Sequence, residues 1–486
     1  MRKPAPIAIV GGGPCGLTFA RLLETAGIDY VIFERDISAE NALQFQGGTL
    51  DLHGETGQEA LRRAGLIEEF EKLARRDATT LTVQDFRGNL RKTFGEGRDA
   101  PEIDRLQLRQ LLLNSLPAHR IRWAKALQGI ERTSKVGYGH IADCTLRFTD
   151  GSTESGFRLV VGADGAWSKV RPLITPAEPQ YSGRMFIEGR ISPGNPQYAA
   201  AHEMVGAGNS LASTRGCTLC IQQMSDRSYR VYMGLEVPST FTRPGGEGDI
   251  TKPEKARAAV LQHYADWAPH LRAFVEAAEE PWRPWPLHRL DPEIYLDGSP
   301  NWTRVPGVTL LGDAAHLATP NGDGVNIAMY DALVLFDSLM EEVRKKQSNT
   351  YQEGEDAVAV ERAISAYEAD MRARGRAHIL DSIDMEDMMF AEDGTALTAA
   401  NTTFTGRDAI HSMLADFVAR SSSMEHRVLS MVVDEKAGKV ATQQRYIGKL
   451  KDGTENDMHN CNFFDVDEEG RIEKVVVWMG GGSPLK

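Results

Sequence analysis

Three glycines near the start of the chain have the spacing of a phosphate-binding turn, and they are Gly11, Gly13 and Gly16. In such a turn the first glycine permits a tight bend, the second lets the backbone approach a pyrophosphate, and the third lets a helix pack closely on a strand. Glu34 follows 18 residues after Gly16, where a carboxylate can accept a hydrogen bond from a ribose hydroxyl. The spacing therefore predicts a dinucleotide site.

A strand, a helix and a second strand must position these groups. Residues 7–10 and 30–33 are fully apolar, and apolar side chains recur at helix spacing after Gly16. This order is the βαβ unit of a parallel sheet. The amino end of the helix offers unpaired N–H groups and a positive dipole end to a phosphate.

Two later apolar runs each end in a turn that contains glycine and aspartate. One ends at residues 162–165, which include Asp164, and the other ends at Gly312 and Asp313. Open α/β sheets bind their ligands at the carboxyl ends of strands. A long amphipathic helix is predicted at 327–345, after a polar turn.

Residues 181–286 have a different pattern. The runs 218–221 and 229–233 nearly alternate, which predicts antiparallel strands of a substrate-side sheet. Residues 251–278 have a helical pattern, and 281–286 form a rigid aromatic corner rich in proline and tryptophan.

The pattern is helical at 357–389, and its character changes after residue 390. An amphipathic helix is predicted at 407–420. Four strands with short, hairpin-like connections follow at 428–433, 440–448, 457–466 and 472–478. This combination is typical of a separate small domain.

Composition limits the classes of function. The chain has 486 residues and a net charge of -13, so its field repels nucleic acid and anionic membranes. Five cysteines without regular spacing favour a reducing compartment. The amino-terminal residues do not resemble a signal peptide, and no apolar run approaches the roughly 18 residues of a membrane span. A cytoplasmic protein without a membrane segment is expected.

The ordered motifs resemble those of class A flavoprotein monooxygenases of the para-hydroxybenzoate hydroxylase type. The similarity is closest to the tetracycline-inactivating enzymes of the TetX type and covers about residues 5–385. The segments that carry it are 11–16 with Glu34 and Arg35, 47–53, 57–60, 101–109, 162–171 with Ser168 and Arg171, and 312–316.

The resemblance implies FAD as the cofactor and NADPH or NADH as the cosubstrate. It places Asp164 in a motif that approaches both the flavin pyrophosphate and NAD(P)H, and it aims the amino end of the helix after Gly324 at the anionic edge of the flavin ring. The implied binding residues are Gly11, Gly13, Gly16, Glu34, Arg35, Asp51, Arg105, Asp164, Gly312, Asp313, Gly324 and Asn326. Two positions depart from the tetracycline enzymes: Asp323 stands where glutamine is common, and Gln44 stands where an arginine is implicated in NADPH binding.

The implied reaction is hydroxylation or oxidative rearrangement of a small aromatic, indolic or polyketide-like molecule in secondary metabolism. O₂ would be the second substrate and a flavin hydroperoxide the oxidant, with no metal and no side-chain nucleophile. Two alternatives remain open. One is an FAD-dependent oxidase or dehydrogenase, and the other is a flavoprotein without catalytic activity.

The last domain resembles the SnoaL-like branch of the nuclear-transport-factor-two-like superfamily, through residues 404–410, 463–466 and 470–472. It would be a second catalyst that cyclises or isomerises the oxidised product, or a lid and assembly module that makes a homodimer. Asp457 and His459 share one strand face, either as an acid/base pair or as part of an exposed or interface strand.

Three other groups have two interpretations each. His316 is either a catalytic histidine or a structural hydrogen-bonding group at a strand end. Cys217 and Cys220 are either a redox pair or two small core residues. Trp282 and Trp285 either line a substrate cavity or pack in a corner beneath the sheet.

The expected fold is α/β, with a β-sheet substrate domain inserted into a Rossmann-like FAD-binding domain and a C-terminal α+β, cone-shaped SnoaL-like domain. The expected boundaries are 1–180 for the first part of the FAD-binding domain, 181–286 for the substrate sheet, which also takes in 78–102, 287–345 for the last FAD-binding part, 346–389 for a C-terminal helix and linker, and 390–486 for the SnoaL-like domain.

Overall fold

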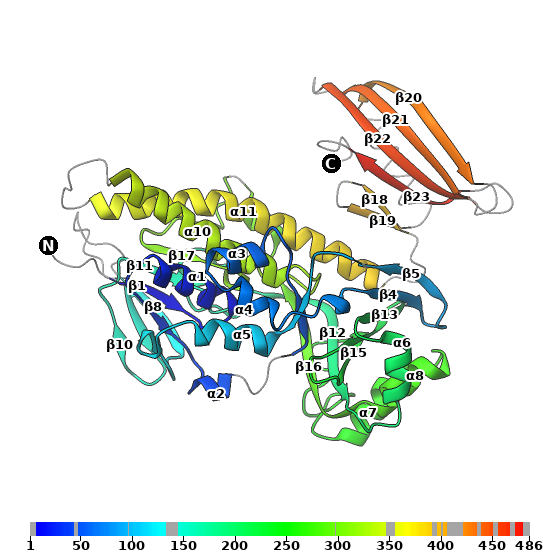
Figure 1. The fold of residues 1–486 in the computed structure, drawn as a ribbon, viewed down its shortest axis with the longest axis horizontal. Helices are drawn as coiled ribbons and strands as arrows, with labels where there is room; N and C mark the ends of the chain where they lie inside the picture. Colours follow the sequence, from blue (N-terminus) through cyan, green and yellow to red (C-terminus); the bar gives the residue numbers. More distant parts are fainter. Residues whose placement is uncertain are drawn as a thin grey trace. The chain divides into compact units, whose positions relative to one another are not determined.

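The computed structural model has two compact units, Met1–Ile383 and Asp384–Lys486. Both can be followed along the chain in Figure 1. The structure describes residues 6–42, 47–95, 97–132, 144–296, 298–346, 355–390, 396–399, 402–405, 421–434, 439–450, 455–466 and 472–479.

A five-stranded parallel sheet forms the centre of the first unit. Both faces of this sheet are covered, which requires apolar strands, and every residue of the strand at 7–10 is buried. All five carboxyl ends lie at one edge. The strand order is β17 (Val308–Leu310), β11 (Leu159–Gly162), β1 (Ile7–Val10), β2 (Tyr30–Phe33) and β7 (Ile121–Arg122).

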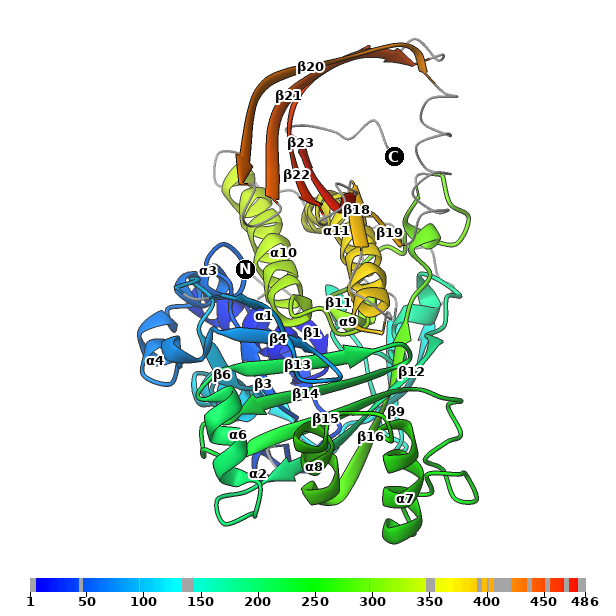
Figure 2. The ribbon, with the colours of Figure 1, turned by 90° about the vertical axis from the view of Figure 1, so that its right-hand side faces the viewer.

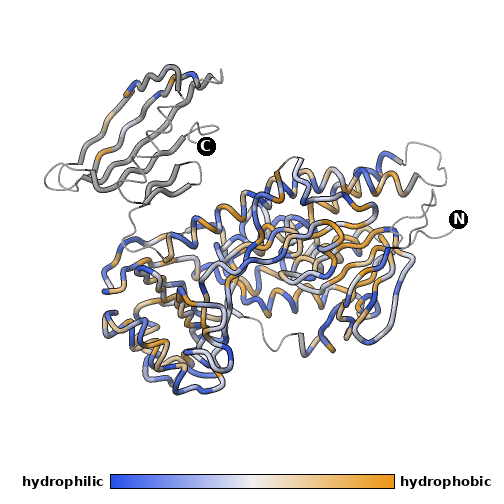
Figure 3. Tube along the Cα trace, turned by 180° about the vertical axis from the view of Figure 1, so that it is seen from behind, coloured by the Kyte–Doolittle hydropathy of each residue, from blue (hydrophilic) through white to orange (hydrophobic). Residues whose placement is uncertain are grey.

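Helices and a small sheet cover this parallel sheet. Phe33 of β2 packs on Phe148 of the small sheet, with ring centroids 4.9 Å apart, and Figure 3 shows hydrophobic segments gathered in this region. The covering elements are α1 (Pro14–Thr25), α3 (Gly57–Arg63), α4 (Ile67–Glu71), α5 (Arg105–Asn114), α10 (Gly324–Lys346), and the antiparallel sheet of β8 (Leu127–Arg132), β9 (Cys144–Phe148) and β10 (Thr153–Glu154).

A seven-stranded sheet is inserted between the parts of the parallel one. Met185 and Ile187 point into a core shared with three helices, which Figure 2 shows on one side of this sheet. The order is β16 (Glu279–Arg289), β12 (Gln180–Ile191), β15 (Tyr229–Glu236), β14 (Cys217–Gln223), β13 (Asn209–Thr214), β4 (Leu81–Asp85) and β5 (Leu90–Phe94), with α6 (Tyr198–Val205), α7 (Pro253–His263) and α8 (Pro269–Ala277).

Two expectations for this region need correction. The helical pattern at 251–278 forms two helices, because Pro269 starts the second one and cannot donate a backbone hydrogen bond to the turn before it. The expected corner at 281–286 is part of β16, an edge strand. Edge strands tolerate proline because one side of the strand needs no ladder hydrogen bond.

Two long helices, α10 and α11 (Glu355–Met389), lie side by side, and the boundary between the two units falls within α11, after Ile383 (Figures 1 and 2). Arg362 of α11 forms an ion pair with Glu342 of α10, with Nη2 and Oε2 2.7 Å apart. Among the described residues, no helix combines the length and the apolar character that a membrane crossing requires.

The second unit contains a four-stranded antiparallel sheet, and the four strands predicted from the sequence all fall within it. The strands are β20 (Ser421–Asp434), β21 (Lys439–Leu450), β22 (Glu455–Val466) and β23 (Ile472–Met479), and β18 (Ala396–Ala399) pairs with β19 (Thr402–Thr405). The helix predicted at 407–420 lies outside the described residues.

Candidate functional site

The glycine-rich turn after β1 has the geometry that its sequence predicts. Gly11 has a φ of 108°, and a Cβ there would lie 2.3 Å from the carbonyl oxygen of Ala163. A Cβ on Gly16 would lie 2.2 Å from the oxygen of Gly11, so a side chain would push α1 off the strand. A Cβ on Gly13 would meet no atom of the described residues within 4 Å. The turn is therefore tightly packed at Gly11 and Gly16, and it is open at Gly13, where a pyrophosphate would approach the protein backbone.

Glu34 lies at the end of β2 and reaches back to this turn. Its Oε2 accepts a hydrogen bond from the Gly12 amide at 2.5 Å, and its Oε1 accepts one from the Asp36 amide at 3.0 Å. Each carboxylate oxygen has a further lone pair. The side chain is thus fixed in place and can still accept bonds from ribose hydroxyls.

Arg109 of α5 supports this corner, and the sequence analysis assigned it no role. Its Nε donates to the Gly12 carbonyl at 2.9 Å, and its Nη2 lies 3.0 Å from Asp36 and 3.5 Å from Glu34. It is 4% exposed. The available signal was one arginine among the leucines 106, 108 and 111–113, because a buried cation needs partners.

Arg171 ties the ends of β11 and β17 together. Its Nε donates to the carbonyl of Ala314 at 2.8 Å, and its Nη2 donates to those of Ala166 at 2.7 Å and Asp313 at 3.0 Å. Burial lowers the pKa of this guanidinium. Arg171 therefore holds the carboxyl ends of β11 and β17, which are far apart in sequence, next to each other.

Two carboxylates at this edge retain free acceptor positions. Asp164 Oδ2 accepts from the Lys169 amide at 2.7 Å, whereas its buried Oδ1 has no hydrogen-bond partner among the described residues. Burial raises the pKa of Asp164. Asp313, the first residue of α9 (Asp313–His316), is exposed. Such acceptors fit a ligand that carries hydroxyl donors, as the ribityl chain and ribose of FAD do.

Asn326 joins the start of α10 to β3 (Thr49–Asp51). Its Nδ2 donates to the carbonyl of Asp51 at 2.8 Å, and its Oδ1 accepts from the amide of His53 at 2.8 Å. The side chain is fully buried. The predicted residues Asp51, Gly324 and Asn326 are thus brought together at one point of the fold.

Arg35 and Arg105 are both exposed. Arg35 follows Glu34 at the end of β2. Arg105 begins α5, and its amide donates to the Gly48 carbonyl at 3.2 Å. Gln44 lies outside the described residues.

His316 lies inside the protein. It is 2% exposed, and its Nε2 is 2.6 Å from Oδ2 of Asp331 on α10. The same carboxyl group accepts from the Gly312 amide at 2.8 Å and, through Oδ1, from Arg374 Nη1 at 2.8 Å. Burial alone would lower the pKa of His316, but the adjacent Asp331 outweighs it and raises the pKa. We therefore favour the structural interpretation of His316.

The face of the seven-stranded sheet opposite its helices carries a second group of side chains. The Tyr232 hydroxyl accepts from the Gly48 amide at 2.9 Å. Glu188 accepts from Trp285 Nε1 at 2.8 Å and forms an ion pair with Arg230 at 3.2 Å. The Phe186 and Tyr232 rings meet edge to face at 6.1 Å.

Side chains that are three residues apart on a strand point to opposite faces, because the side-chain period of a strand is two residues. This applies to the two tryptophans and to the two cysteines that each had two interpretations. Trp282 is 7% exposed and lies in the core, whereas Trp285 is 41% exposed and lies on the face with Glu188. Cys217 and Cys220 likewise point to opposite faces, so they cannot form a disulfide with each other. Burial raises the pKa of both thiols to about 12.

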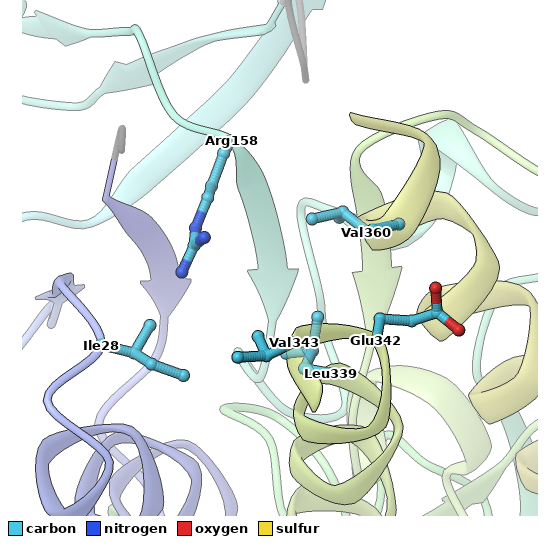
Figure 4. A pocket seen from close by; sticks show the side chains of 7 residues that line it. Ile28, Arg158, Leu339, Glu342, Val343 and Val360 are labelled. Carbon is cyan, nitrogen blue, oxygen red and sulfur yellow. The ribbon is translucent and has the colours of Figure 1, made fainter. Parts of the chain in front are cut away.

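In the second unit, the backbone places Asp457 and His459 on β22, opposite Ile447 and Arg445 of β21. A hollow in the first unit lies at the amino ends of the parallel strands, away from the motifs (Figure 4). It is lined by Ile28, Arg158, Leu339, Glu342, Val343, Ala359 and Val360. It does not belong to the candidate site.

The fold and site define a dinucleotide-binding protein. Residues 4–188 match the FAD binding domain model FAD_binding_3, and residues 373–475 match the SnoaL-like domain model SnoaL_2. The second match begins inside α11.

Known proteins narrow the class. The monooxygenase asqM of Emericella nidulans is 31% identical over 418 residues, which is 76% of this chain and 92% of that protein. The crystal structure of Klebsiella pneumoniae HpxO with FAD and uric acid has a TM-score of 0.61 at 22% identity and covers 80% of this chain and 90% of its own. The tetracycline destructase Tet(51) has a TM-score of 0.54 at 17% identity, with 79% and 91% covered.

This chain belongs to the FAD-dependent monooxygenases, and it carries a C-terminal SnoaL-like domain. The family, the fold class and the FAD cofactor expected from the sequence are confirmed.

Proposed function

We propose that this enzyme uses NADPH or NADH to reduce FAD, and that it transfers one oxygen atom of O₂ to a small aromatic, indolic or polyketide-like molecule in cytoplasmic secondary metabolism. Bound FAD supplies hydride acceptance, oxygen activation and oxygen transfer. The observation that carries the proposal is the set of open acceptors at the edge where β1, β2, β11 and β17 end. The main one is the buried Oδ1 of Asp164, which has no hydrogen-bond partner among the residues that the structure describes.

The residues of this edge have separate tasks. The open backbone at Gly13 and the amino end of α1 hold the pyrophosphate. Glu34 accepts from the ribose hydroxyls, and Asp313 accepts from hydroxyl groups nearer the ring. The amino end of α10 stabilises negative charge on the reduced ring, since its first N–H groups have no partner within the helix.

The substrate is bound over the face that carries Phe186, Glu188, Tyr232 and Trp285. Rings of this kind favour a planar partner through offset or edge-to-face packing. Glu188, which is 6% exposed, adds a buried acceptor for an N–H or O–H group of the substrate. A planar heteroaromatic compound with a polar hydrogen fits this combination.

A single set of measurements tests the proposal. The FAD-loaded protein is mixed anaerobically with NADPH or NADH and a panel of aromatic and indolic compounds, and loss of flavin colour is followed. Turnover under ¹⁸O₂ should then give a product about 18 mass units heavier than the substrate, against about 16 under ordinary O₂. An oxidase would instead form hydrogen peroxide and an unlabelled product. A flavin that no nicotinamide cofactor reduces with any compound would indicate a protein without this activity.

Two roles of the C-terminal unit must be distinguished: it is either an assembly or lid module or a second catalyst. We propose comparing the full chain with a chain that stops at Phe390, in product mass spectra and in light scattering. Loss of a dimer with an unchanged product favours assembly. A changed product favours catalysis, and Asp457→Asn and His459→Gln then test the acid/base pair.

A further inference from the structure

His53 lies between two carboxylates that come from separate parts of the chain. Its Nε2 is 3.0 Å from Oδ2 of Asp51, and its Nδ1 is 3.3 Å from Oδ1 of Asp323. A neutral imidazole carries one N–H, so one ring nitrogen would present its lone pair to a carboxylate oxygen. Only the imidazolium can donate to both.

The surroundings of the ring favour the charged form. Hydrogen bonds to Asp323 and then to Asp51 raise the pKa of His53 to about 9, against the opposing effect of burial. Arg98 contacts the same oxygen of Asp51 as His53 does, with Nη2 and Oδ2 2.5 Å apart, so the two cations share this carboxylate. The ring is 33% exposed, so solvent weakens these interactions without removing them.

Helix α11 contributes the other titratable groups near this turn. His378 lies 3.3 Å from the side-chain amide of Asn321, and burial lowers the pKa of this histidine to about 4. Burial raises the pKa of Asp381. His378 is therefore uncharged near neutral pH. Within the part of the chain that the structure describes, His53 is the cation in direct contact with Asp323.

This bridge connects the two segments that meet at the start of α10. The backbone of His53 donates to Asn326, which in turn holds the carbonyl of Asp51. On the other side, the carbonyl of Asp323 accepts from the amide of Ile327 in the first turn of α10. A charge between Asp51 and Asp323 thus fixes the position of the helix end relative to β3.

We propose that His53, as an imidazolium, is a positioning residue that holds β3 and the amino end of α10 in the geometry that binds FAD. The inference rests on the placement of FAD made in the proposed function. His53 acts through Asp51, Asp323 and Asn326 rather than by transferring a proton.

The first test measures the protonation of His53 directly. The full chain, with ¹⁵N-labelled histidine, is titrated by NMR without FAD, and His53→Gln assigns the signal. We expect a pKa near 9, which falls toward the ordinary value of about 6.5 in Asp323→Asn. A ring that titrates near 6.5 in the wild type, or that ignores Asp323→Asn, would overturn the charged bridge.

The second test measures FAD binding from pH 7 to 9.8 by flavin fluorescence, with circular dichroism to confirm folding. We expect the wild-type dissociation constant to rise about fivefold across this range, because the bridge loses its charge. His53→Gln should bind about fivefold more weakly at pH 7 and show no further loss. His53→Lys keeps a charge and should therefore recover part of the affinity. The control variant His119→Gln changes an exposed histidine that is distant from His53 in the sequence, and it should match the wild type.

The outcomes separate this inference from the proposal on which it rests. If His53→Gln binds FAD like the wild type at every pH while Asp313→Asn does not, the positioning role is wrong and the FAD placement stands. If Asp313→Asn also binds normally, the placement itself is wrong. A parallel loss in His53→Gln and His53→Lys, with no pH dependence, would show a role in packing and would also overturn the role of the charge.

Discussion

Arg109 lies with its Nη2 3.5 Å from Oε2 of Glu34, and both side chains are buried. The arginine comes from α5 and the glutamate from the end of β2, and they meet at the carbonyl and amide of Gly12. Arg109 and the Gly12 amide thereby fix the position of the Glu34 carboxylate, which we propose accepts hydrogen bonds from ribose hydroxyls.

Arg109→Leu should destabilise the protein by about 3 kcal/mol, because it leaves Glu34 and Asp36 without their buried cation. FAD binding should weaken as well, since the Gly12 turn loses a hydrogen bond. Thermal unfolding with and without FAD measures both effects. Arg62→Leu, at an exposed ion pair with Glu59, should cost less than about 1 kcal/mol. Equal effects of the two substitutions would contradict the buried role.

Asp313→Asn should weaken FAD binding by about tenfold or more, because a charged acceptor is replaced by a neutral one. The melting temperature without FAD should hardly change, since Asp313 is exposed. Equilibrium dialysis against FAD and a melting curve of the cofactor-free protein give the two values. A protein that purifies with full flavin content would refute the assigned contact.

The two buried histidines should give opposite pH dependence of stability. Asp331 raises the pKa of His316 above 6.5, so the stabilisation from this ion pair is complete below pH 6.5 and is lost as pH rises through the raised pKa. Burial lowers the pKa of His378 to about 4, so its contribution is present above pH 6.5 and is lost toward pH 4.

Urea unfolding between pH 4 and 9 checks both signs. The stability advantage of the wild type over His316→Gln should shrink as pH rises. The advantage over His378→Gln should shrink as pH falls. Curves that stay parallel to that of the wild type would show that neither histidine changes its proton affinity on folding.

Glu188→Gln should raise KM for the substrate about threefold or more and leave FAD content unchanged, because a charged acceptor is weakened without a loss of volume. Trp285→Ala should act in the same direction. Trp282→Phe is the matched control on the opposite face of β16, and it should lower the melting temperature without changing KM. Steady-state kinetics with the best compound of the panel decides this, and an unchanged KM in Glu188→Gln would place the substrate elsewhere.

The sequence alone determined the glycine-rich turn, the parallel strands and the family. This was possible because local spacing sets these features: Gly11 needs its positive φ, Gly16 needs the close contact with the turn, and buried parallel strands need continuous apolar runs. The four strands of the second unit were also predictable, since hairpin connections are local.

Only the tertiary structure decided which side chains share an edge or a face. Arg109 and Glu34, His53 and Asp323, and Glu188 and Trp285 are far apart in sequence, and no local pattern pairs them. The face on which Trp282, Trp285, Cys217 and Cys220 lie depended on strand register, where a shift of one residue exchanges the two sides. Whether His316 met solvent or a buried carboxylate depended on the packing of α10 and α11 around it, because burial and charge pairing arise only when distant segments come together.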